Sequence, residues 1–123
     1  MTTLHASGTD EVISRLLNMI LMARYSLSVE SVRQQIAGAL DLIIYVTRLV
    51  DGSRRVMTMS QVSSTEEGNI KINELFHFDI EKITENELIG KFVRNPMYLT
   101  NRISNKLIAV GLSNEYKAIF ASP

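Results

Sequence analysis

The stretch Leu42-Ile43-Ile44-Tyr45-Val46-Thr47 decides how the chain folds, because it marks the change from helical to extended structure. Its β-branched and aromatic side chains favour a strand. Asp51-Gly52 follows at the place where a tight hairpin turn is needed. The residues from Arg55 to Val62 alternate in polarity, so this part of the sequence predicts a β-hairpin.

A third strand is predicted directly after the hairpin. The residues from Thr65 to Asn69 supply another turn, and Ile70-Lys71-Ile72 then begins a strand with a period of two. The sequence therefore predicts an antiparallel three-stranded meander with one face available for burial. The pattern weakens from Glu81 to Glu87, where we expect a linker or a short helix.

Two amphipathic helices are predicted before the hairpin. The first begins near Val12, and its apolar residues recur at spacings of three and four. The second follows Ser28, which is placed to cap it. We expect these helices to form a hairpin that covers the apolar face of the sheet.

A further helix is predicted near the C-terminus. Asn95-Pro96 is a suitable start, Leu99, Ile103 and Leu107 form one stripe, and Gly111 is placed to end the helix. The tail from Leu112 to Pro123 is expected to be a short amphipathic appendage.

The composition excludes several classes of function. The chain has 123 residues, enough for one domain with a core. Its 13 Lys and Arg balance 13 Asp and Glu, so no global field favours nucleic acid or an anionic membrane. The sequence contains no cysteine, which excludes disulfides and thiolate metal sites and suits a cytoplasmic protein. We expect no nucleic-acid partner.

Four blocks of sequence, read in order, resemble the type II/IV secretion ATPase superfamily. They are Arg15-Leu16, residues 31–37 (Ser-Val-Arg-Gln-Gln-Ile-Ala), Asp41-Leu42-Ile43 and residues 48–56 (Arg-Leu-Val-Asp-Gly-Ser-Arg-Arg-Val). Their order and spacing are most similar to the C-terminal part of the motor ATPases of tight-adherence (Flp) pili. The resemblance implies an α/β fold, with residues 1–78 as the C-terminal part of a RecA-like P-loop ATPase domain and residues 79–123 as a C-terminal helical appendage.

The resemblance also assigns a role to His5. Thr3-Leu4-His5-Ala6 matches a segment that, in these ATPases, ends a core strand and places a histidine beside the terminal phosphate of the nucleotide. A neutral imidazole can donate to a phosphoryl oxygen or to a positioned water. The resemblance therefore implies that His5 senses the phosphate in the intact motor. The alternative is a solvated histidine near a chain end.

The parts that would bind ATP and magnesium are not found in this sequence. It has no phosphate loop of the form G-x-x-x-x-G-K-[ST] and no acidic strand end before His5. ATP and magnesium are therefore expected only in the intact parent, and this chain is expected to be inactive alone. Met1 to Ala6 is expected to be the end of an element that begins in a preceding segment, so that Thr2 to His5 lack strand partners.

Several arginines are candidates for nucleotide or subunit contacts, because arginine can pair bidentately with phosphate or carboxylate. The resemblance places Arg15 and Arg33 near the nucleotide edge or the neighbouring subunit. Arg15 could instead pair with an acidic neighbour, and Arg33 could be solvated on a helix flank. Arg48, Arg54 and Arg55 flank the turn at Asp51-Gly52 and form either an interface at the rim of the motor domain or a solvated hairpin tip.

Three further polar positions have narrower expectations. Asp41 is expected to pair with an arginine or to cap the end of the preceding helix. His5 and His77 lack the short spacing of zinc ligands, so no metal site is predicted. At Gln61 the ATPases commonly have glutamate, which puts in doubt any ion pair made there.

Two functions follow from these observations. The resemblance implies a C-terminal fragment of a hexameric, ATP-driven motor for pilus assembly or type II/IV secretion. Its partners would be the other subunits of the homohexamer and inner-membrane platform proteins, and it would lie in the cytoplasm, peripheral to the inner membrane. The alternative is a stand-alone α+β module that binds a protein partner without nucleotide.

Overall fold

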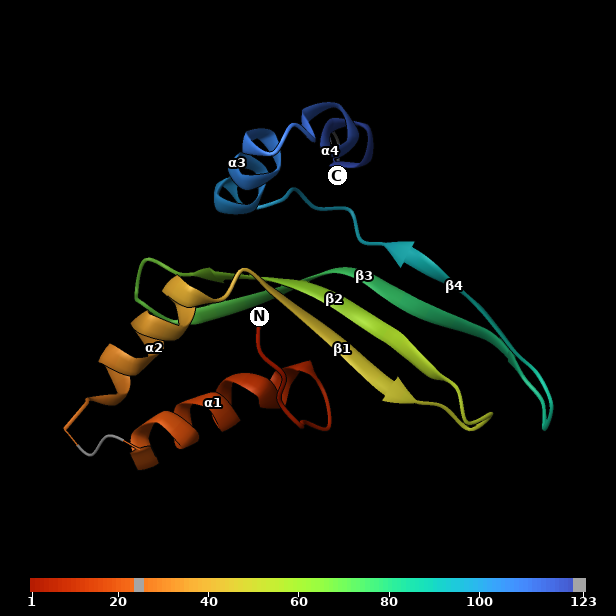
Figure 1. Cartoon of the computed structure of the whole chain (residues 1–123), viewed down its shortest axis with the longest axis horizontal. Helices are drawn as coiled ribbons and strands as arrows, with labels where there is room; N and C mark the ends of the chain where they lie inside the picture. Colours follow the sequence, from red (N-terminus) through yellow and green to blue (C-terminus); the bar gives the residue numbers. More distant parts are fainter. Residues whose placement is uncertain (24–25, 121–123) are drawn as a thin grey trace.

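The computed structural model describes residues 1–23 and 26–120 as a mixed α/β fold (Figure 1). The elements within these residues are, in order, α1 (Thr9–Ala23), α2 (Val29–Ala39), β1 (Leu42–Arg48), β2 (Arg54–Ser64), β3 (Ile70–Ile83), β4 (Leu88–Arg94), α3 (Asn101–Ala109) and α4 (Ser113–Phe120). The strands form one antiparallel sheet of order β1-β2-β3-β4. The pair α1 and α2 lies on one side of the sheet, and α3 and α4 lie on the other (Figure 1).

The predicted helical hairpin is confirmed. Ser28 caps α2, because its Oγ accepts a hydrogen bond from the Ser31 N–H at 3.1 Å. The helix buries Val32 and Ile36 against the sheet. The innermost side chains of the core are Val32, Val62 and Leu75, which are 0%, 1% and 2% exposed. The core therefore lies between the helical hairpin and the inner strands.

Both predicted turns are also confirmed. Gly52 has φ 82°, and the Leu49 N–H donates to the Ser53 carbonyl at 2.8 Å. Asp51 fixes this turn, because its Oδ1 accepts from the N–H and the hydroxyl of Ser53 at 3.0 and 2.7 Å. Gly68 has φ 82° in the next turn. A positive φ is the conformation that glycine adopts without strain.

The prediction of three strands is wrong, because the described sheet has four. The linker or short helix expected from Glu81 to Glu87 is instead the end of β3 and a tight turn, in which the Thr84 N–H donates to the Glu87 carbonyl at 2.8 Å. The register of β3 against β4 shifts between Ile80 and Lys82. This bulge breaks the period of two within β3 and so hides the last residues of that strand in the sequence.

The sheet also crosses the boundary expected between residues 1–78 and residues 79–123. β3 runs without interruption past residue 78, so the sheet includes residues from both 1–78 and 79–123. The second segment is helical only from Asn101 onward.

The start predicted for the third helix is wrong by several residues. The side chain of Asn95 donates to the Glu74 carbonyl, and its backbone N–H donates to the Leu75 carbonyl, both at 2.8 Å. These bonds keep the chain beside β3, and α3 begins only after Thr100, its N-cap. The predicted stop is confirmed, since Gly111 has φ 84° just past the helix end. The expected tail forms α4, and residues 121–123 lie outside the described residues.

Among α1 to α4, which make up the helices of the described ranges, none is both long enough and apolar enough to cross a bilayer.

Candidate functional site

The N-terminal segment, residues 1–6, lies in neither a helix nor a strand and passes close to α1 and β1. Its end is held by β1, because the Tyr45 hydroxyl donates to the Ser7 carbonyl at 2.9 Å. Glu11, in the first turn of α1, also binds Ser7. Its Oε2 accepts the Ser7 N–H at 2.6 Å. These two bonds fix where the segment that carries His5 meets the folded part of the chain.

Glu11 also provides the acidic neighbour expected for Arg15. Its Oε1 lies 3.5 Å from Nη1 of Arg15, one helical turn further along α1. The backbone N–H of Ser7 is the main reason that the pKa of Glu11 lies below its ordinary value, and Arg15 adds to the effect. The carboxylate is therefore charged at neutral pH and partly balances the arginine.

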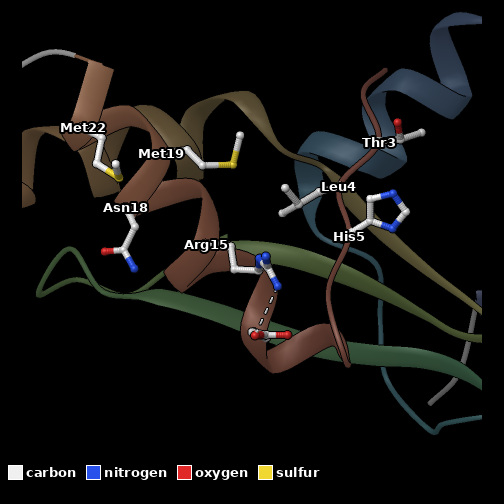
Figure 2. Close-up of a pocket in the computed structure, with 8 residues that line it drawn as sticks. Thr3, Leu4, His5, Arg15, Asn18, Met19 and Met22 are labelled. Atoms are coloured by element: carbon white, nitrogen blue, oxygen red, sulfur yellow. Dashed lines mark hydrogen bonds and ion pairs between the residues drawn. The ribbon is translucent and has the colours of Figure 1, made fainter.

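His5 and Arg15 line one cavity of about 730 Å³ between the N-terminal segment and α1 (Figure 2). The other lining residues are Thr3, Leu4, Glu11, Asn18, Met19 and Met22. In Figure 2 the Arg15 side chain points toward the segment that carries Leu4 and His5, whereas the His5 ring is directed to the opposite side. The cavity thus offers an anion one guanidinium directly, and the imidazole after a rotation of His5.

His5 also lines a second cavity, of about 530 Å³, between residues 2–6 and strand β1. We call this second cavity the β1 groove. Arg48, at the end of β1, and Arg54, at the start of β2, lie opposite each other in the sheet and line it. Nε of Arg48 donates to the Gly52 carbonyl at 3.2 Å. The fold therefore brings three of the five candidate arginines to cavities that His5 shares.

The other two candidate arginines line neither of these cavities. Arg33 is exposed on α2. Arg55 lies over the ring of Phe78, 5.4 Å from its centroid, and its Nε donates to Ser53 Oγ at 3.3 Å. Arg55 is thus engaged by the hairpin turn through Ser53 and by β3 as a cation–π partner of the buried Phe78 ring.

A charged cluster that was not predicted from the sequence joins α3 to the corner between α2 and β1. Asp41 pairs with an arginine, as expected, and its partner is Arg102 at 2.6 Å, with Lys106 Nζ at 2.5 Å. The Arg102 guanidinium also donates to the carbonyls of Ala37 and Gly38, at 3.0 and 3.1 Å, and to that of Leu40. The signal in the sequence was the spacing of four residues between the two cations, which places both on one face of a helix.

Gln61 makes a second connection to α3. Its side chain is 5% exposed, donates to the Tyr98 carbonyl and accepts the Thr100 N–H, both at 2.9 Å. This pair of bonds needs both halves of an amide, so the glutamine has a role here that an ionised glutamate could not fill.

Within residues 1–23 and 26–120, no group of three or more histidine, aspartate or glutamate side chains is arranged to hold a metal ion. No protein-family model matches the chain, and no curated protein matches its sequence. The functional proposal therefore depends on the resemblance of short segments and on the geometry of the residues in them.

Proposed function

We propose that the chain is the C-terminal part of the ATPase domain of a hexameric motor that drives pilus assembly or type II/IV secretion. The observation that carries this proposal is that His5 and Arg15 line one cavity at the edge of the helical hairpin. Both residues lie in segments that resemble the secretion ATPases.

In this proposal His5 reports on the terminal phosphate of ATP. Its segment is attached by Ser7 to both α1 and β1, so a movement of His5 is transmitted to the helical hairpin and to the sheet. Arg15 supplies a positive charge on the other wall of the cavity. Glu11 orients that arginine and limits its attraction for anions in the absence of nucleotide.

ATP and magnesium belong to the intact motor in this proposal. A phosphate loop and a magnesium-binding acid, which this sequence does not contain, have to come from another segment. The remaining surfaces would then contact neighbouring subunits of the ring and platform proteins of the inner membrane, on its cytoplasmic side.

The first test is to read the DNA sequence that precedes the codon of Met1. The proposal expects the same reading frame, or an adjacent gene, to encode a phosphate loop and an acidic strand end. If neither is present, the motor assignment fails.

The second test uses the protein that joins that segment to this chain. His5→Ala is expected to reduce its ATP hydrolysis by about 100-fold or more, the size of effect found when one preorganised hydrogen-bond donor to a developing negative charge is removed. Ser14→Ala, an exposed position on α1 outside the cavity, is the control and should leave the rate unchanged. Equal rates for the His5→Ala variant and the unchanged protein would contradict the role of His5.

One observation favours the alternative, a stand-alone module that binds a protein partner. Strand β1 carries exposed apolar side chains along its length, which is unusual unless another polypeptide covers them. The absence of any encoded phosphate loop, together with capture of a peptide partner, would support this second function.

A further inference from the structure

Strand β1 is one of the two edges of the sheet within the described residues, and β4 is the other. Among them only β2 pairs with β1, so the backbone N–H and C=O groups along its other side have no strand partner there, and residues 42–48 of β1 line the β1 groove. Such a row of groups is a template for one more strand. The seven residues of β1 offer an extended segment about 23 Å of pairing length.

The side chains of this edge are apolar where a polar face would be expected. Leu42, Ile44 and Val46 occupy alternate positions and so share one face of the sheet. They are 39%, 52% and 51% exposed. A partner with apolar side chains at every second position would cover them in register.

The charges that line the groove determine which side chain the partner needs at one of its ends. Arg48 and Arg54 face each other across β1 and β2, and like charges in this arrangement repel. None of the described residues that line the groove is acidic. The two arginines therefore leave a positive end that an acidic side chain would neutralise.

We propose that the β1 groove binds an extended strand of a partner polypeptide, with apolar residues at alternate positions and an acidic residue beside Arg48 and Arg54. The partner adds a fifth strand to the sheet. This binding goes beyond the proposed motor function and does not use the nucleotide cavity, although His5 lies between the two. Occupation of the groove would hold residues 2–6 against α1.

The test uses a synthetic peptide of alternating valine and threonine that ends in two glutamates, and a matched peptide that ends in two lysines. Fluorescence anisotropy should show saturable binding of the first peptide to the full chain. Hydrogen exchange should show new protection along β1. The lysine peptide should bind about tenfold more weakly at low salt.

Two variants check the surface itself. Ile44→Lys, at a half-exposed position, should abolish binding of the glutamate peptide, whereas the control Val50→Lys should not, because Val50 is 81% exposed and lies outside the groove. The double variant Arg48→Glu and Arg54→Glu should reverse the preference and select the lysine peptide. A reversed preference cannot be explained by unfolding, because an unfolded variant would bind neither peptide.

Three results would overturn the proposal. The first is no binding of either peptide. The second is dimerisation of the free chain that Ile44→Lys abolishes, which would make a second copy the occupant. The third is strong exchange protection at Thr3 and Leu4 in the free monomer, which would show that the N-terminal segment already fills the groove.

Discussion

Nε of Arg102 lies 2.6 Å from Oδ1 of Asp41, and this ion pair joins helix α3 to the start of strand β1. The same guanidinium donates to backbone carbonyls at the end of α2, so one side chain connects three elements. Figure 1 shows α3 and α4 on the side of the sheet opposite the helical hairpin. Their position therefore depends on a charged carboxylate as well as on apolar packing.

The first prediction concerns Asp41→Asn. The hydrogen bond from Lys106, with the charge of Arg102, holds the pKa of Asp41 below its ordinary value of 3.8. A lowered pKa in the folded state stabilises the fold above the pKa of the unfolded chain, and this stability is lost as the pH falls through the folded value. We expect Asp41→Asn to lower the free energy of unfolding by about 1 kcal/mol at neutral pH, since Lys106 is largely exposed.

Urea unfolding of both proteins across the acid range measures this effect. The difference between them should begin to shrink as the pH falls below the ordinary value of 3.8, and it should vanish only once the pH lies below the lowered pKa of folded Asp41. Glu66→Gln, in an exposed turn, is the control and should change little. A constant difference at every pH would show that the charge of Asp41 is not involved.

The second prediction concerns Gln61→Glu. An ionised carboxylate cannot donate to the Tyr98 carbonyl, and the position is buried, so we expect a loss of about 1–3 kcal/mol at neutral pH. Burial raises the pKa of the introduced carboxyl. Stability should therefore recover as the pH falls, because the protonated acid can donate again. Gln35→Glu, at an exposed site on α2, is the matched control. Equal losses at neutral and acid pH would argue against this hydrogen bond.

The third prediction tests the packing of the fourth strand at Gly90, with Gly38 in α2 as the comparison. A Cβ added at Gly90 would lie 2.5 Å from the Asp79 carbonyl oxygen and 2.7 Å from the ring of buried Phe78. Gly90→Ala should therefore lower the free energy of unfolding by about 1–3 kcal/mol. Gly38→Ala, in α2 with nothing within 4 Å of the added Cβ, should raise it by about 0.5–1 kcal/mol. Thermal unfolding of both variants measures the two signs. An unchanged free energy of unfolding in Gly90→Ala would contradict the close pairing of β3 and β4.

Local chemistry made part of the fold predictable. Ser28 caps its helix, and Asp51-Gly52 forms its turn, because each depends on residues only a few positions apart. The far end of β3 was missed because the bulge near Glu81 shifts its alternation, and β4 was missed because Gly90 weakens the strand pattern of Leu88–Arg94. The start of α3 was missed because Asn95 is held by Glu74, a contact that no local pattern reveals.

The candidate site was predictable in its residues but not in its grouping. His5 and Arg15 were singled out by resemblance, and the acidic neighbour of Arg15 follows from helical spacing. A second cavity is shared by His5, Arg48 and Arg54, and it exists because of the path that residues 2–6 take past β1. That path is set by the two bonds to Ser7, one of them from a residue far along the chain.

Phosphate release from MgATP by the purified chain is the most direct test of the motor proposal. The cavity shared by His5 and Arg15 supplies a sensor and one cation, but no cradle for the phosphates. We predict no release above the buffer rate for the chain alone, and hydrolysis that depends on His5 once a phosphate-loop segment is joined to it. Hydrolysis by the chain alone would contradict the proposal.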